Sequence, residues 1–220
     1  MKTAVISGVS SGIGLEVARR LLAEKYMVIG CSRNRPPIDD IVFFKCDIRN
    51  TDEVESFARF VKEKVSHIDV LLNNAGMTYV KKFEDFTPEE IDEIIETNTT
   101  GIMKKTLLLL PLLKEGSIII NLGSVAAVMH FPEWSVYNAS KFALRGWSKA
   151  LRKELSERGI RVTLINPGAV WTPFWEKIGF ERAYNMLSAE DVAQVIMDVI
   201  HLPPHVDVEE LLITHVRRAH

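Results

Sequence analysis

The residues best suited to chemistry are Tyr137 and Lys141, which stand four positions apart in the stretch Tyr137-Asn-Ala-Ser-Lys141. On a helix, this spacing places both side chains on one face, about one turn apart. A positive charge near a phenol stabilises the phenolate and lowers a pKa that is ordinarily about 10. The pair therefore predicts a tyrosine that acts as a general acid and base near neutral pH.

Ser124 supplies a second hydroxyl upstream of this pair. It follows the apolar run 117–122, which predicts a strand, and ligands of open parallel sheets bind at the carboxyl ends of the strands. We expect its hydroxyl to hold a substrate oxygen against the phenol of Tyr137. A tyrosine and a lysine at this spacing also occur on amphipathic helices that have no catalytic role, so the function depends on the rest of the chain.

The elements that must position these residues follow from the apolar pattern. Runs of four to six apolar residues alternate with longer amphipathic stretches, which is typical of a parallel sheet covered by helices. The pattern predicts strands near residues 2–7, 27–32, 42–46, 68–72, 117–122, 160–165 and 211–215. It predicts helices near residues 12–25, 51–65, 88–112, 135–158 and 188–201. With no repeat or linker in the sequence, we expect one α/β domain.

Three glycines follow the first predicted strand, in Ser7-Gly-Val-Ser-Ser-Gly-Ile-Gly14. Glycines between a strand and a helix let the backbone turn tightly and approach a pyrophosphate, whose charge the helix N-terminus favours. The spacing of Gly8, Gly12 and Gly14 differs from the commoner G-x-G-x-x-G pattern. The loop indicates a dinucleotide site, and tight packing is the alternative reason for its glycines.

Ser32 and Arg33 follow the second predicted strand, about twenty residues beyond the glycines. Sites that select NAD often hold an acid here for the ribose 2′-hydroxyl, whereas an arginine suits the 2′-phosphate of NADP. A hydrogen bond to a charged group contributes about 1.5–3 kcal/mol. The residues therefore favour NADP over NAD, unless Arg33 is merely solvated. The short segment 34–40 contains two prolines and predicts an irregular connection in place of a crossover helix.

Polar residues also follow other predicted strands. Asp47 comes directly after the third strand, where it could accept a hydrogen bond from an adenine amino group or simply begin a turn. Asn73-Asn-Ala-Gly76 follows the fourth strand, at an edge where ligands bind. Asn98 falls within a predicted helix that Gly101 weakens, and its presence there could be incidental.

These motifs, in this order and over nearly the whole chain, resemble the short-chain dehydrogenase/reductase family. The resemblance rests on the glycine loop, Asn73–Gly76, Asn98, Ser124 with Tyr137-x-x-x-Lys141, and Pro167-Gly168 with Val170 and Thr172. It implies a single Rossmann-type domain over residues 1–220, with a doubly wound, mostly parallel seven-stranded sheet and helices on both faces. It also implies hydride transfer between NADP(H) and a small-molecule carbonyl or alcohol.

The resemblance implies four catalytic residues. Ser124 would polarise the carbonyl, and Tyr137 would donate the proton in reduction. Lys141 would lower the pKa of the tyrosine and hold the nicotinamide ribose. Asn98 would anchor a water that links Lys141 to solvent.

The resemblance also implies a row of cofactor contacts along the strand ends. Ile13 and Gly14 would lie against the phosphates, and Asn74 beside the adenosine ribose. Other residues would meet the adenine, at Asp47 and Ile48, and the nicotinamide, along 167–172. The expected cofactor-binding residues are Gly8, Ser10, Ser11, Gly12, Ile13, Gly14, Ser32, Arg33, Asp47, Ile48, Asn74, Ala75, Gly76, Tyr137, Lys141, Pro167, Gly168, Val170 and Thr172.

Aromatic residues gather in sequence around the predicted site, in the segments 130–134 and 173–187. They favour an apolar or aromatic carbonyl substrate, with a lid or a subunit contact as the competing interpretation. The predicted helices near 88–112 and 135–158 are unusually apolar, which favours a homodimer or homotetramer over a monomer. A helix packed on a sheet can be equally apolar for that reason alone.

Composition excludes several other classes of function. The 220 residues are 47% hydrophobic, which suffices for one large core, and the formal net charge of −2 indicates neither nucleic acid nor membrane as a partner. With no secretory signal or apolar span, we expect a cytoplasmic protein. Cys31 and Cys46 are expected to stay reduced, no metal site is expected, and the basic end 217–220 reads as a solvated tail.

Alternative functions remain within and outside this enzyme class. A reductase of 3-oxoacyl thioesters or of pterins would use the same catalytic residues. An NADP-binding sensor without turnover is the alternative from another class, and such proteins usually lose the tyrosine or the lysine. Activity toward carbonyl compounds, hydroxy acids or serine would separate these possibilities.

Overall fold

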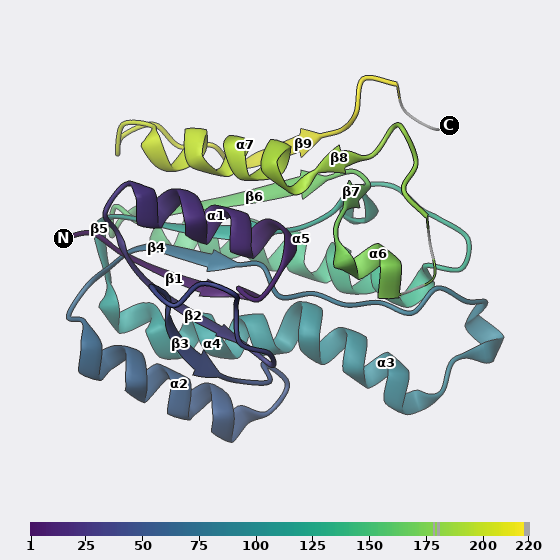
Figure 1. Ribbon diagram of the computed structural model, residues 1–220, viewed down its shortest axis with the longest axis horizontal. Coiled ribbons are helices and arrows are strands. Elements are labelled where there is room, and N and C mark those ends of the chain that lie inside the picture. The colour runs from purple at the N-terminus through teal and green to yellow at the C-terminus, as the bar shows by residue number, and fades with distance from the viewer. Residues whose placement is uncertain (178, 180, 218–220) are drawn as a thin grey trace.

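Among the described residues, seven strands form one sheet in the order β3-β2-β1-β4-β5-β6-β9 (Figure 1). Every neighbouring pair in this sheet is parallel. The strands are β1 (Thr3–Ser7), β2 (Met27–Ser32), β3 (Val42–Lys45), β4 (Ile68–Asn73), β5 (Leu113–Leu122), β6 (Arg161–Pro167) and β9 (Glu210–Ile213). The predicted doubly wound α/β fold is confirmed, because the chain adds strands first on one side of β1 and then on the other.

The computed structural model describes residues 1–177, 179 and 181–217. Two residues of the predicted aromatic segment, Ile178 and Phe180, lie outside the described residues. So do residues 218–220 of the predicted basic tail.

Helices cover both faces of the sheet (Figure 1). On one face, α1 (Gly12–Ala23) and α7 (Ala189–His201) pack over one core cluster. On the other, α2 (Thr51–Lys64), α4 (Gly101–Leu109) and α5 (Ser135–Ser156) pack over a second. Strand residues alternate between the two cores, which is why the strands are continuous apolar runs.

The connection from β2 to β3, residues 33–41, contains no helix, as its prolines predicted. β3 lies at one edge of the sheet, and β9 lies at the other. Cys31 at the end of β2 and Cys46 just after β3 are both free and buried.

The predicted helix near 88–112 is confirmed as a helical span, but it is not a regular α-helix. The chain forms α3 (Pro88–Ile95), a π-helical turn (Glu96–Thr100), α4 and a 3₁₀ turn (Leu110–Leu112). Gly101 follows the π-helical turn, and its N–H donates to the carbonyl oxygen of Glu96. A Cβ at Gly101 would lie 2.4 Å from the carbonyl oxygen of Ile48, so close packing against a distant loop requires glycine there.

Short elements near the sheet edge escaped sequence analysis. A second, two-stranded parallel sheet pairs β7 (Val170–Trp171) with β8 (Leu187–Ser188), and α6 (Pro173–Lys177) lies between them in the chain. Two-residue strands carry no readable period. The 3₁₀ turns Phe83–Asp85 and Val125–Ala127 are equally short.

Substituting Gly101→Ala should lower the free energy of unfolding by about 1–3 kcal/mol, because the new methyl group meets a backbone carbonyl that cannot move freely. The matched control is Gly146→Ala, in the exposed middle of α5, where nothing lies within 4 Å of the added Cβ. That change should raise stability by roughly 0.5–1 kcal/mol. Urea unfolding of both variants measures the difference, and equal effects would contradict this account of the close packing at Gly101.

Candidate active site

Three of the predicted catalytic side chains meet at the carboxyl edge of the sheet. Ser124 follows β5, and Tyr137 and Lys141 lie on successive turns at the start of α5. The hydroxyl of Tyr137 is hydrogen-bonded to the side chain of Ser124. The backbone N–H of Ser124 donates to Oδ1 of Asn166 over 3.1 Å. The structure therefore brings the hydroxyls of Ser124 and Tyr137 together, as the sequence predicted.

The side chain of Lys141 lies over one face of the Tyr137 ring. Its ammonium lies 5.6 Å from the centroid of the Tyr137 ring and donates to the carbonyl oxygen of Leu122 over 2.9 Å. The residue is only 4% exposed. A cation is thus held beside the phenol by the end of β5.

Electrostatics in the site differ from the sequence expectation in one respect. Burial raises the pKa of Tyr137 to about 12, and its hydrogen bond with Ser124 acts in the opposite direction without overcoming burial. Burial also lowers the pKa of Lys141 to about 8. Tyr137 is half-buried as a whole, but its hydroxyl end is desolvated, and a desolvated phenolate is costly. The expected lowering of the tyrosine pKa is therefore reversed in this chain.

This reversal has a chemical consequence. A phenol with a pKa of about 12 keeps its proton at neutral pH, as a general acid must, but it is a weaker acid than an ordinary tyrosine. It therefore gives up its proton only to a strongly basic acceptor. An oxygen that gains negative charge during a reaction is such an acceptor.

Asn98 is fully buried in the π-helical turn and joins the site through the Asn73–Gly76 loop. Its amide exchanges two hydrogen bonds of 2.8 Å with the backbone of Met77 and donates a third, of 3.0 Å, to Ser140 Oγ. At exposed Gly76, a Cβ would lie 3.5 Å from Asn98 Oδ1 and 3.8 Å from Lys141 Nζ. Gly76 therefore lies close to both the asparagine and the lysine, at distances where an added Cβ would make ordinary contacts. A π-helical turn at such a position is typical of functional sites.

The glycine turn after β1 is shaped by Asn74. Its side-chain amide donates to the carbonyl oxygens of Ser7 and Gly8 at 3.2 and 2.9 Å. A Cβ on Gly8 or Gly14 would lie 2.7 or 2.4 Å from that same amide nitrogen. Tight packing therefore explains these two glycines, and Gly8 also has a left-handed φ of +71°.

The start of α1 nevertheless fits a dinucleotide. Ser11, the residue before the helix, makes no side-chain cap, so the first N–H groups of α1 have no side-chain acceptor there. A Cβ at Gly12 would lie 3.1 Å from Thr172 Cγ2, so glycine holds open the gap between the loop and the 167–172 stretch. These residues could hold a pyrophosphate with the nicotinamide end alongside. Half-buried Ser10, buried Ile13 and half-buried Ala75 complete this side of the turn.

The residues expected at the adenosine lie in different environments: one is exposed, one is in the core and one is in an ion pair. Arg33 is exposed at the end of β2, beside Ser32, whose hydroxyl donates to the carbonyl oxygen of Asn34. Ile48 turns its side chain into the core. Asp47 is held by Arg49, through contacts of 2.8 to 3.1 Å to both carboxylate oxygens. Burial alone would raise the pKa of Asp47, but the hydrogen bonds and charge of Arg49 hold it below the usual range.

Sequence analysis missed Arg49, which also pairs with Glu93 of α3. Tyr79 donates to the same Glu93 over 2.5 Å. This network joins the end of β3 to α3 beside Arg33, whose charge acts on both Asp47 and Glu93. A basic residue two positions after the acid was the one local signal that could have suggested it.

The nicotinamide side is built by the chain after β6. Pro167 ends that strand, and Gly168 N–H donates to the carbonyl oxygen of Ile213 over 2.8 Å. Val170 is buried in β7, which directs Thr172 toward the glycine turn. All the residues expected along this side therefore lie on one continuous stretch.

The predicted aromatic cluster divides in two. Trp134 packs 5.5 Å from the Tyr137 ring and 5.7 Å from Trp175, which in turn lies 5.9 Å from Phe174. These rings form a wall that joins α6 to Tyr137, and we call Trp134, Trp175 and Phe174 the aromatic wall. His130 instead stacks on Phe142, 5.6 Å away, and Tyr184 is 80% exposed.

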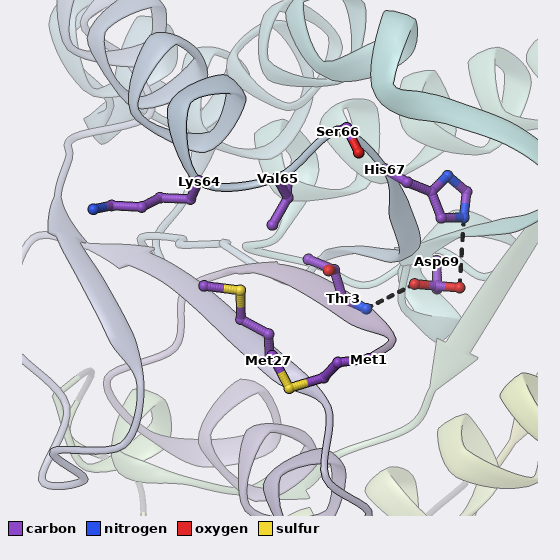
Figure 2. A pocket seen from close by; sticks show the side chains of 8 residues that line it. All are labelled: Met1, Thr3, Met27, Lys64, Val65, Ser66, His67 and Asp69. Carbon is purple, nitrogen blue, oxygen red and sulfur yellow. Dashed lines mark hydrogen bonds and ion pairs between the residues drawn. The ribbon is translucent and has the colours of Figure 1, made fainter.

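The cavity drawn in Figure 2 lies at the other end of the sheet. It has a volume of about 290 Å³ and is lined by residues at or before the amino ends of β1, β2 and β4. In it, Asp69 accepts from the backbone N–H of Thr3 and faces His67 at 3.5 Å (Figure 2). Ligands of open α/β sheets bind at the carboxyl ends, so this cavity is not the catalytic site.

Two further searches cover the part of the chain that the structure describes. There, no three His, Cys, Asp or Glu side chains come together as metal ligands would. Within residues 1–177, 179 and 181–217, none of the helices combines the length and apolar character needed to cross a membrane.

Comparison with known proteins places this geometry in a family. The sequence model described as short chain dehydrogenase matches residues 2–183. The chain belongs to this family. Among curated members, an uncharacterized oxidoreductase of Staphylococcus epidermidis is 32% identical, over 98% of this chain and 97% of that protein. The chain is thus an oxidoreductase of the short chain dehydrogenase family.

Solved structures of similar fold carry nicotinamide cofactors. An alcohol dehydrogenase from the archaeon Thermococcus sibiricus, complexed with 5-hydroxy-NADP, has a TM-score of 0.89 and 27% identity over 100% of this chain and 98% of its own. The closed form of serine dehydrogenase complexed with NADP⁺ has the same score and identity, covering 99% and 96%. A 3-ketoacyl-(acyl-carrier-protein) reductase from Brucella melitensis, complexed with NADH, has a TM-score of 0.86 and 27% identity, covering 98% of both chains.

The raised pKa of Tyr137 predicts that its phenol stays protonated past the ordinary tyrosine value of about 10. Ultraviolet difference absorbance of tyrosinate, wild type minus Tyr137→Phe, should show no signal below that pH and one only toward pH 12. The sign follows from burial, which penalises the charged form. A tyrosinate signal that appears well below pH 10 would mean that Lys141 outweighs burial.

Proposed function

We propose that this member of the family is an NADP(H)-dependent oxidoreductase that transfers a hydride between the cofactor and a carbonyl or alcohol, with Tyr137 as general acid and base. One observation carries the proposal: the hydroxyls of Ser124 and Tyr137 are hydrogen-bonded at the edge where the sheet meets the glycine turn, with Lys141 buried beside the ring. Because the two hydroxyls lie next to each other, both can donate a hydrogen bond to the same substrate oxygen.

Each residue then has a chemical task. When bound, NADPH supplies the hydride that reaches the carbonyl carbon. The hydroxyls of Ser124 and Tyr137 stabilise the charge that grows on the carbonyl oxygen, without reorganising as it grows. Tyr137 gives its proton to that oxygen, and Lys141 holds the nicotinamide ribose and offsets the phenolate left behind. Asn98 would anchor a water through which the proton returns from solvent to Lys141.

NADP rather than NAD is the proposed cofactor. Arg33 is exposed and accompanied by Ser32, with no acid at the end of β2 to hold a ribose 2′-hydroxyl. Two similar structures are complexes with an NADP-type cofactor, and the Brucella melitensis reductase is complexed with NADH. The choice therefore depends on Arg33 more than on the relatives.

The proposed substrate is an apolar or aromatic carbonyl compound, because the aromatic wall stands against Tyr137. Flat apolar groups pack well on tryptophan rings. The alternative from the same class is a 3-oxoacyl thioester, which the similarity to the Brucella melitensis reductase favours. A sensor without turnover is disfavoured because the tyrosine, lysine and serine remain together.

A cytoplasmic homodimer or homotetramer is the proposed state of the protein. Cys31 and Cys46 are free thiols, which fits a reducing compartment. On α4 and α5, Leu107 and Phe142 are 68% and 38% exposed, and apolar side chains on neighbouring helices are suited to association. Light scattering measures the assembly directly.

Tyr137→Phe should keep cofactor affinity and lower turnover by roughly 10²–10⁴. The assay follows NADPH absorbance with a panel of aromatic aldehydes, diketones, quinones and a 3-oxoacyl thioester, and NADP⁺ with hydroxy acids and serine. Tyr26→Phe is the matched control, since Lys2 lies over that ring at the same 5.6 Å, away from the site. Full activity of Tyr137→Phe would refute the proposal, and NADPH binding without turnover across the panel would support the sensor.

Arg33→Ala should weaken NADPH binding about ten- to a hundredfold, the loss of one charged contact to phosphate, and should change NADH binding little. The matched control is Arg35→Ala, two residues along the same loop, where the guanidinium faces Asp39 at 3.6 Å. Dissociation constants for both cofactors, measured by fluorescence titration, give the comparison. Equal losses for NADPH and NADH would show that Arg33 does not contact the 2′-phosphate.

A further inference from the structure

Basic residues continue the catalytic face of α5 beyond the active site. Tyr137, Lys141, Arg145 and Lys149 are spaced by four positions, so they follow one side of the helix. The first two belong to the catalytic group. The next two pair with Glu210 of the edge strand β9, at 2.7 and 2.9 Å. One helix face thus connects the reacting phenol to the far edge of the sheet.

Glu210 is tightly held. Oε1 accepts from Arg145 Nε at 2.7 Å and Oε2 accepts from Nη2 at 3.1 Å, and Lys149 approaches Oε2. Its side chain is 17% exposed. Burial alone would raise the pKa of Glu210, but Arg145 and Lys149 hold it below the usual range. Bidentate, charge-assisted contacts of this kind fix a carboxylate in one orientation.

Asn166, at the end of β6, links this carboxylate to the catalytic serine. Its Nδ2 donates to Glu210 Oε1 over 2.8 Å, while its Oδ1 accepts from the backbone N–H of Ser124 over 3.1 Å. Asn166 has no exposed surface, and a Cβ on Gly123 would lie 2.0 Å from its Oδ1. The two partners require opposite ends of the amide, so the amide orientation is determined.

We propose that Glu210 is a positioning residue for the reaction: through Asn166 it fixes the backbone of Ser124, and through Arg145 and Lys149 it fixes the helix that carries Tyr137. We call this linked set the Glu210 brace. The inference rests on the proposed function, because it concerns the relative placement of the two proton donors.

A brace is needed because the two donors come from separate elements. Ser124 sits in the turn after β5, behind a glycine, and Tyr137 lies on α5 after an intervening loop. Their hydroxyls must keep a common distance to one substrate oxygen, and a displacement of about 1 Å can cost about 10²-fold in rate. Glu210 contacts both sides from the outer edge, without touching the reacting atoms.

The first test compares three single variants. Glu210→Ala should lower kcat about 10- to 100-fold while leaving KM and the NADPH dissociation constant unchanged. Glu210→Gln should retain most of the activity, since its amide oxygen still accepts from Asn166. Glu209→Gln is the matched control, because the Glu209 side chain pairs with Lys149 and Arg152, at 3.1 and 3.5 Å, whereas Asn166 donates to Glu210.

The second test asks whether the chain of contacts acts as one unit. Asn166→Ala cuts the brace at its centre, so the further loss of kcat from Glu210→Ala should vanish in that background. Hydrogen exchange at the Ser124 amide, read by NMR with ¹⁵N-serine, should become faster in Glu210→Ala and stay slow in Glu210→Gln and Glu209→Gln. This readout also serves when one of the variants is too unstable for kinetics.

The results separate the two ideas. If Glu210→Ala only lowers the melting temperature and leaves both kcat and the Ser124 amide unchanged, or if Glu209→Gln loses as much kcat, the brace is wrong. If the wild-type protein oxidises no NADPH and reduces no NADP⁺ with any compound of the panel, the proposed function fails. Even then, the rate of hydrogen exchange at the Ser124 amide in Glu210→Ala shows whether Glu210 fixes the backbone of Ser124.

Discussion

Desolvation of one phenol and one ammonium is the constraint on which the site depends. Burial raises the pKa of Tyr137 to about 12 and lowers that of Lys141 to about 8, so both groups are pushed toward their neutral forms. The Leu122 carbonyl and the Ser124 hydroxyl are the nearby partners that hold them. Because burial penalises the charged forms, the phenol keeps its proton and gives it up only to a strongly basic acceptor, such as a substrate oxygen that becomes negative.

The fold supplies that environment through contacts between loops. Asn74 occupies the space that Gly8 and Gly14 leave, so the fourth strand end holds the turn of the first. Asn98 bonds the next part of the same loop to α5 through Ser140. Asn74 therefore joins two strand ends and Asn98 joins a loop to a helix, and both shape the proposed cofactor edge.

The strands and most helices could be predicted because apolar period is a local property. The helical span near 88–112 was predicted too, but its π-helical turn was not, and neither was the close approach of Gly101 to the backbone of Ile48, which is distant in the chain. The aromatic residues were equally ambiguous: Trp134 packs against both Tyr137 and Trp175, while His130 stacks on Phe142. Spacing along the chain cannot say which of several nearby rings shares a pocket.

Sequence alone determined the fold class and the residues with catalytic potential, since both follow from residue type, order and helical or strand spacing. Tertiary structure decided how those residues behave. Burial raises the pKa of Tyr137, where the sequence predicted a lowered pKa. Arg49 forms an ion pair with Asp47. Asn166 connects Glu210 to the backbone of Ser124 through hydrogen bonds. The physical reason is that desolvation and hydrogen bonding depend on what packs around a group, and those neighbours come from strands and helices distant in the chain.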